Sequence, residues 1–179
     1  MDKHGLSAFT VLLFGLAVWR LGLSAELPAV LAFILGGVLL AVIDGKVRRL
    51  PTKLVYRTLG GVAAGLLFAS VVTRDWVPLA TALAGAALFA GAFFLIWFVS
   101  KWANTITLLG LGDVRLAAVL GLLLGWYGLP YVLYGAFAGS IMAIPVALVA
   151  CLRRRQLVTH FAFGPPLIAG TLAVVLLHG

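Results

Sequence analysis

The sequence predicts an all-α polytopic membrane protein, and three observations lead to that fold class. First, 64% of the 179 residues are hydrophobic and only 10% are charged, which gives a mean hydropathy of +1.18. Second, the apolar residues form runs of about 17–25 residues, the length that a helix needs to cross a bilayer. Third, most lysines and arginines fall in the short connections between these runs. We expect about six or seven spanning helices in a single integral membrane domain, residues 1–179, since no linker is long enough to separate two domains.

The first expected span, Leu6–Leu23, is an apolar run that follows Lys3. A cleaved signal peptide is the rival interpretation, because such a peptide has a basic start, an apolar stretch and a small-residue cleavage site, here Ser24-Ala25. Arg20 interrupts the end of the apolar stretch, which favours a retained helix. Either interpretation leaves the orientation of the other spans unchanged.

The other expected spans follow one another with short connections between them. In chain order they are Leu27–Ile43, Leu54–Val72, Val77–Val99, Val114–Trp126, Tyr131–Cys151 and Pro166–His178. The fifth and seventh spans are the shortest, so we expect them to be less tilted or partly interfacial. Pro145 lies inside the sixth span and is expected to kink it.

The basic residues are distributed very unevenly between the two sides of this arrangement. Only Arg20 and Arg74, of 13 lysines and arginines, fall on or near one side. The other side carries Lys3, Lys46, Arg48, Arg49, Lys53, Arg57, Lys101, Arg115, Arg153, Arg154 and Arg155. Because cytoplasmic connections are rich in lysine and arginine, this asymmetry predicts a cytoplasmic N-terminus in a plasma (inner) membrane. It also explains the net charge of +8 by topology and attraction to anionic membrane lipids, without nucleic acid.

Cysteine and histidine usage argues against metal chemistry. The single Cys151 cannot form an internal disulfide, and the three histidines are far apart in the sequence. No zinc-ligand spacing is present among them. We therefore expect neither a metal site nor a cofactor.

Two aspartates, Asp44 and Asp113, stand at the edges of apolar runs in a chain with only five acidic residues. Asp44 follows the apolar run 27–43, and Asp113 follows Gly110-Leu111-Gly112 and opens another run. Acids at such positions are costly and usually functional. With the predicted topology, both aspartates face the cytoplasm.

The two aspartates could act together or separately. A carboxylate pair that shares one proton can hydrolyse a peptide, with one group activating water and the other protonating the carbonyl. The alternative is that each acid is structural. In that case Asp44 pairs with Arg48 or Lys46, and Asp113 caps the N-terminus of a helix. The residue pattern alone leaves both interpretations open.

Two sequence motifs contain these aspartates and a third follows them. Residues 41–51 read AVIDGKVRRLP, and residues 109–117 read LGLGDVRLA. Phe163-Gly164-Pro165 comes later, with Gly170 beyond it. The Asp-x5-Leu-Pro element, the Gly-x-Gly-Asp element and the Phe-Gly-Pro block, in this order, resemble the type IV prepilin peptidase family over about residues 30–175.

The resemblance implies a GxGD-type aspartic endopeptidase in the membrane, with Asp44 and Asp113 as the catalytic pair. Gly110, Gly112, Pro51, Gly164 and Pro165 come with the motifs as supporting residues. The implied substrates are prepilins or pseudopilins of pilus and secretion systems, proteins with an apolar N-terminal helix from which a short basic leader is removed at the cytoplasmic face. The chain resembles the compact form of the family, which is expected to lack the cysteine-containing methylation segment.

The sequence departs from the family pattern at two positions near the aspartates. Thr52 follows Pro51 where an acid or asparagine is usual, and Arg115 replaces a usual lysine. Two other functions also stay open: a non-catalytic assembly subunit of a pilus or secretion system, and a proton-coupled transporter. A transporter would place its acids nearer the middle of the bilayer.

Overall fold

The computed structural model describes the backbone of residues 3–47, 51–102, 110–154 and 164–178, and the side chains of residues 5–45, 51–102, 110–145 and 164–178. All elements within these ranges are α-helices. They are α1 (Lys3–Leu21), α2 (Leu27–Val47), α3 (Thr52–Thr73), α4 (Val77–Trp102), α5 (Leu111–Tyr127), α6 (Leu129–Arg154) and α7 (Gly164–His178). The expected all-α membrane fold is confirmed, and each expected span corresponds to one helix.

Among the residues that the structure describes, three helices, α2, α3 and α4, are long and apolar enough to cross a membrane on their own. Shorter apolar helical stretches occur at 5–21, 129–145 and 164–178. At about 1.5 Å per residue, the 15 residues of α7 fall short of a typical hydrocarbon core, which is about 30 Å thick. Helix α6 continues through Pro145, so the proline does not end it.

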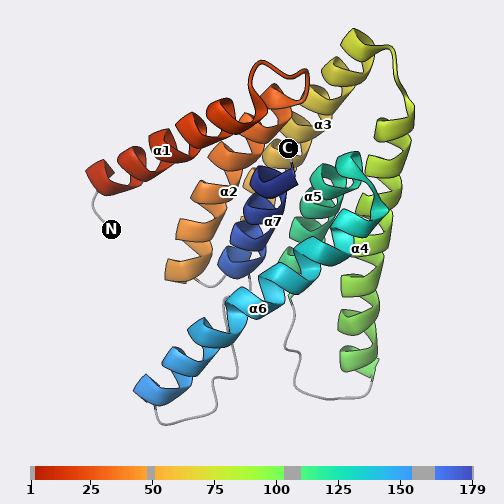
Figure 1. The fold of residues 1–179 in the computed structure, drawn as a ribbon. Helices are drawn as coiled ribbons and strands as arrows, with labels where there is room; N and C mark the ends of the chain where they lie inside the picture. The colour runs from red at the N-terminus through yellow and green to blue at the C-terminus, as the bar shows by residue number, and fades with distance from the viewer. Residues whose placement is uncertain (1–2, 48–50, 103–109, 155–163, 179) are drawn as a thin grey trace.

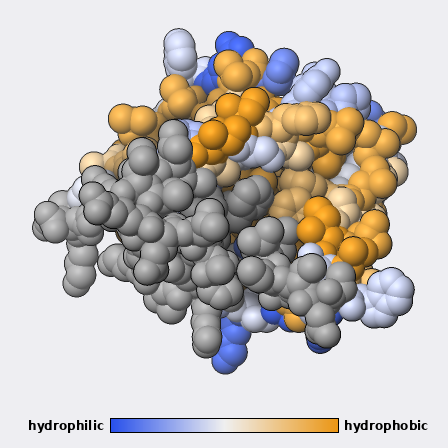
Figure 2. All heavy atoms as spheres, turned by 90° about the horizontal axis from the view of Figure 1, so that it is seen from below, coloured by the Kyte–Doolittle hydropathy of each residue, from blue (hydrophilic) through white to orange (hydrophobic). Residues whose placement is uncertain are grey.

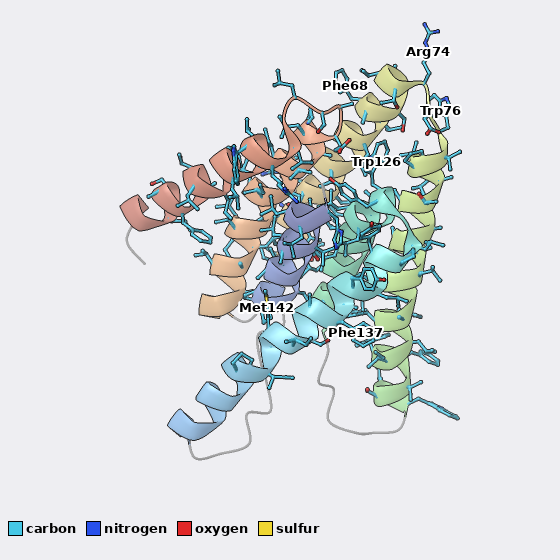
Figure 3. All side chains as sticks on the ribbon, viewed as in Figure 1. Phe68, Arg74, Trp76, Trp126, Phe137 and Met142 are labelled. Atoms are coloured by element: carbon cyan, nitrogen blue, oxygen red, sulfur yellow. The ribbon has the colours of Figure 1, made fainter. Side chains whose placement is uncertain are left out.

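The bundle has two distinct ends (Figure 1). The turns between α1 and α2, α3 and α4, and α5 and α6 lie at the upper end, near the C-terminus of α7. The C-terminal ends of α2, α4 and α6 lie at the lower end. In Figure 3, Arg74, Trp76 and Trp126 lie in the upper half, whereas Phe137 and Met142 lie lower, on α6.

Helix α5 forms the centre of the bundle. It packs against α3, α4, α6 and α7, and its residues from Leu116 to Gly125 are buried with the exception of Ala118. In contrast, the large apolar side chains of α4 are mostly exposed, as expected of a surface that faces lipid. Figure 2, which views the molecule from the lower end, shows hydrophobic residues over much of the described surface.

Glycines allow at least three pairs of described helices to pack closely: α2 with α3, α4 with α5, and α6 with α7, where a Cβ at Gly170 would meet the Gly139 backbone. A Cβ at Gly65 of α3 would lie 2.6 Å from Ala29 Cα of α2, and a Cβ at Gly125 of α5 would lie 2.6 Å from the Thr81 carbonyl oxygen of α4. Both contacts are too short for any side chain, so the small residues are required by packing. The tight helical hairpins α2–α3 and α4–α5 carry the two aspartates, Asp44 on α2 and Asp113 on α5.

The first helix is joined to the last by a polar contact at the upper end. Arg20 donates hydrogen bonds from Nε to the Leu176 carbonyl oxygen at 2.9 Å and from Nη2 to the Leu177 carbonyl oxygen at 3.1 Å. These carbonyls belong to the last turn of α7, whose partial negative charge a guanidinium complements. Arg20, which interrupts the apolar pattern of its own helix, thus caps another helix.

Candidate active site

Asp44 lies in the last turn of α2, near the lower end of the bundle. The helix continues to Val47, past the Ile43 boundary expected from the apolar run, so Asp44 is held by regular helical backbone. Its side chain is only 5% exposed, and Oδ2 has no hydrogen-bond partner among the described residues. The alternative partners Arg48 and Lys46 lie outside the side chains that the structure describes. A buried carboxyl oxygen without a partner is unfavourable unless the group has another use.

Asp113 lies in the first turn of α5. The helix begins at Leu111, three residues before the expected start at Val114, because Gly110 serves as the N-cap and Asp113 as the third helical residue. Asp113 Oδ2 accepts a hydrogen bond from the Gly110 backbone N–H at 3.0 Å. This contact is one half of a capping box. The helix-capping role considered from the sequence is therefore present, and it fixes the orientation of the carboxyl group.

The structure brings the two aspartates together although they lie on different hairpins. The Asp44 side chain and Leu116, which is one turn after Asp113 on α5, both lie beside Gly164. Two carboxylates that are close together cannot both ionise easily, because their charges repel, and such a pair holds one proton between them. The two groups differ in exposure: Asp44 is buried with Oδ2 unpaired, whereas Asp113 is partly exposed.

Gly164, at the start of α7, lies against the Asp44 carboxyl group. A Cβ at Gly164 would lie 2.7 Å from Asp44 Oδ2, 3.4 Å from Asp44 Cγ and 3.5 Å from Leu116 Cδ2. The glycine is thus located between α2 and α5, and only its missing side chain leaves room for the carboxyl group. Gly164 is therefore the third component of the site, contributed by a third helix.

The other residues expected to support the site have less direct roles in the geometry. Pro51 is the N-cap of α3, and its carbonyl oxygen accepts hydrogen bonds from the backbone N–H groups of Leu54 and Val55 at 2.9 and 3.2 Å. Gly112 lies in the first turn of α5, and Pro165 follows Gly164 in the first turn of α7. Gly110 has an ordinary extended backbone, φ −92° and ψ 157°, so its dihedral angles do not require glycine.

A polar contact between α3 and α5 was not foreseen from the sequence. Arg115 Nη1 donates a hydrogen bond to Thr52 Oγ1 at 2.9 Å, and Arg115 Cζ lies 5.9 Å from the centre of the Tyr56 ring. Thr52 and Arg115, the two departures from the family pattern near the aspartates, therefore contact each other. Thr52 and Tyr56 are four residues apart on one helix, a spacing that places them on one face. That spacing is the only sequence signal for this contact.

The described side chains include one pair of carboxyl groups from different helices, Asp44 and Asp113. Within that part of the chain, no group of three or more histidine, cysteine, aspartate or glutamate residues could hold a metal ion. The pair of carboxyl groups, one buried and one at a helix N-terminus, can hold and exchange a proton. The fold and the site therefore define a class: all-helical membrane proteins with a pair of carboxyl groups at one end of the helix bundle.

Comparison with known proteins identifies the family. The model of the type IV leader peptidase family matches residues 29–152, which is more than half of the chain, and the chain belongs to that family. It is 33% identical over 175 residues to a protein of Pectobacterium carotovorum subsp. carotovorum named "Prepilin leader peptidase/N-methyltransferase". It is 36% identical over 173 residues to a protein of the same name from Dickeya chrysanthemi.

These alignments cover nearly all of this chain but only part of each relative. They include 97% and 96% of the chain and 57% of each relative, so the chain spans little more than half the length of the curated proteins it matches. A Neisseria gonorrhoeae protein of the same name is 32% identical, with 90% of this chain and 53% of the relative aligned. No solved structure matches the chain at a significant level.

Proposed function

We propose that this protein is an aspartic endopeptidase of the inner membrane that removes short basic leader peptides from prepilins or pseudopilins. The observation that carries the proposal is that Gly164 lies beside both the buried Asp44 carboxyl group and Leu116, which is one turn after Asp113 on α5. Membership in the leader peptidase family and the printed names of the relatives support the substrate class. The proposal is confined to peptide cleavage, because a carboxyl pair supplies that chemistry and not methyl transfer.

In the proposed mechanism the two carboxyl groups start with one proton between them, on Asp44. Asp113 removes a proton from water as the water oxygen attacks the scissile carbonyl carbon. Asp44 gives its proton to the carbonyl oxygen, which forms a neutral tetrahedral intermediate. Asp113 then protonates the leaving nitrogen, Asp44 takes back a hydroxyl proton, and the C–N bond breaks. One water is consumed and both groups return to their starting states.

The proposed location of the site is the cytoplasmic face of the membrane. Lys53 and Arg57 lie near the start of α3, which follows closely after the end of α2 that carries Asp44. Lys101 lies in the last turn of α4, whose C-terminal end is at the lower end of the bundle in Figure 1. Arg20 and Arg74 are near the upper end. Since basic residues favour the cytoplasmic side, the distribution supports a cytoplasmic position for Asp44 and Asp113. An active site there is open to water, which hydrolysis requires.

The proposal is tested by co-expressing the protein with candidate prepilins and following substrate length on a gel. The unchanged protein should shorten its substrate by about the length of a leader, and both Asp44→Asn and Asp113→Asn should abolish the shortening while the protein stays in the membrane. Asp75→Asn is the matched control. Asp75 Oδ1 accepts a hydrogen bond from the Val77 backbone N–H at 3.0 Å, and asparagine can preserve that bond.

The same experiment separates the proposal from the two other functions. A non-catalytic assembly subunit would tolerate both substitutions. A proton-coupled transporter would lose transport without any change in substrate length. Normal processing by either single variant would remove the peptidase assignment.

A further inference from the structure

The two aspartates are supplied by two hairpins, and their separation depends on how these hairpins are held together. Asp44 belongs to the α2–α3 hairpin and Asp113 to the α4–α5 hairpin. Within each hairpin, glycines hold the helices in contacts too tight for a side chain, as at Gly65 and Gly125. Each hairpin should therefore behave as a rigid body. A change in the distance between the carboxyl groups then requires movement of one hairpin relative to the other.

The hairpins meet where α3 contacts α5. Near the aspartates, this meeting includes a polar cluster formed by Thr52, Tyr56 and Arg115. Arg115 lies two residues after Asp113 on α5, and Thr52 is the first residue of α3. The guanidinium group is fixed in two directions, by the hydrogen bond to Thr52 Oγ1 at 2.9 Å and by the Tyr56 ring at 5.9 Å. A planar guanidinium can make both contacts at once, which an ammonium group does less well.

Arg115 does not act by neutralising Asp113 directly. Residues two apart in a helix point to different faces, and the carboxyl group of Asp113 is turned back to the Gly110 N–H. The side chain of Arg115 instead reaches across to the other hairpin. Its described contacts therefore connect helices and leave the two carboxyl groups to interact with each other.

We propose that Arg115 is a positioning residue whose contacts with Thr52 and Tyr56 set the distance between Asp44 and Asp113. The kinetic test of this proposal rests on the proposed peptidase function. A second test depends only on the distance between residues 44 and 113. Since an error of about 1 Å in catalytic geometry lowers rates by about 100-fold, a partial loosening of the two hairpins should lower the rate measurably. It should do so without removing either catalytic group.

The kinetic test compares matched pairs of variants of the full chain, using a prepilin that the unchanged enzyme shortens. Thr52→Val removes the hydroxyl group and keeps the shape, whereas Thr52→Ser keeps the hydroxyl. Loss of a hydrogen bond to a charged group should lower kcat about 3- to 10-fold for Thr52→Val, with KM and Tm unchanged, and Thr52→Ser should restore most of the rate. Tyr56→Phe keeps the aromatic ring and should have a nearly normal kcat. Tyr56→Leu removes the ring and should have a lower kcat.

A double variant decides whether these side chains act as one unit. Arg115→Met should lower kcat by about 10- to 30-fold, and Arg115→Met with Thr52→Val should be no worse than Arg115→Met alone, because the bond is already lost. Multiplicative losses in the double variant would overturn the proposal. So would losses that follow Tm rather than kcat, since these would show a role in folding only.

The second test does not need peptidase activity. Cysteines replace Asp44 and Asp113 in a chain that also carries Cys151→Ser, and a short bifunctional maleimide joins them. The yield of cross-linked protein should fall at least about threefold when Thr52→Val is added, and Thr52→Ser should leave it unchanged. If the aspartate variants described above retain cleavage, the proposed function fails but this result still stands. An unchanged yield with Thr52→Val overturns the positioning role whatever the activity.

Discussion

The contact between Gly164 and Asp44 leads to a sharp prediction for a substitution that adds a single methyl group. In Gly164→Ala the new Cβ would lie 2.7 Å from Asp44 Oδ2 and 3.4 Å from Asp44 Cγ. Carbon atoms pack best at about 3.5–4.0 Å from their neighbours, so the carboxyl group must move by at least about half an ångström. Leu116 on the other side, 3.5 Å from the same Cβ, limits movement of α7 in the opposite direction.

The size of the effect follows from this displacement. A misplacement of about 1 Å in a catalytic group lowers rates by about 100-fold, so we expect kcat to fall by about 10- to 100-fold. Overpacking by one methyl group costs about 1–3 kcal/mol, which lowers Tm by a few degrees but leaves the protein folded. KM should change little because no substrate-contacting group is removed.

The assay measures prepilin cleavage by purified, membrane-embedded enzyme, with Tm measured on the same preparation. Gly91→Ala on α4 is the matched control, because a Cβ there would have no neighbour within 4 Å. It should leave the rate unchanged and stabilise its helix slightly, since alanine is the better helix former. A Gly164→Ala enzyme with a normal rate and a normal Tm would show that the position of Asp44 is not limiting, and would refute this reasoning.

Two further predictions concern topology and the cap on α7. Single cysteines at Thr52, Leu108 and Gln156 should be shielded from an impermeant thiol reagent added outside intact cells, whereas a cysteine at Asp75 should react; reaction at Thr52 from outside would reverse the proposed orientation. Arg20→Met removes both hydrogen bonds to the last turn of α7 and should destabilise the protein by about 1–3 kcal/mol, measured as a fall in Tm. Arg20→Lys should lower Tm by less than Arg20→Met, and an equal fall in Tm for the two variants would contradict a capping role.

The sequence predicted the helices well because short polar connections separate the apolar runs. Each apolar run became one helix, and the errors lie at the ends. The structure starts α5 at Leu111 and α7 at Gly164, whereas the apolar pattern placed the starts at Val114 and Pro166. The pattern missed these first turns because glycine and aspartate resemble loop residues, although both are common where a helix begins.

The site was only partly predictable for a different physical reason. Asp44 and Asp113 were prominent because a charged group is rare in so apolar a chain. The contact between Gly164 and Asp44, in contrast, depends on which helices become neighbours in space. The same is true of the bond between Arg115 and Thr52. Periodicity identifies the face of one helix but not the helix that packs against it, so these contacts appear only in the assembled bundle.

The surroundings of the two aspartates also predict which of them holds the shared proton. Asp44 is buried in the last turn of α2, where the helix dipole disfavours negative charge. Asp113 lies in the first turn of α5, where the dipole favours negative charge, and it accepts the Gly110 N–H bond. We therefore predict that Asp44 is the proton donor and Asp113 the base. The dipole contributes only about 0.3–1 kcal/mol, so the burial of Asp44 must supply most of the difference.

Two measurements test this assignment. Infrared difference spectra of the resting enzyme should show a protonated carboxyl band that Asp44→Asn removes and Asp113→Asn preserves; the opposite pattern would reverse the roles. In cleavage assays the double variant should be no worse than either single variant, because groups that act as a unit give non-additive losses. If each substitution instead removed only part of the rate and their effects multiplied, the two aspartates would be acting independently, and a shared proton could not explain catalysis.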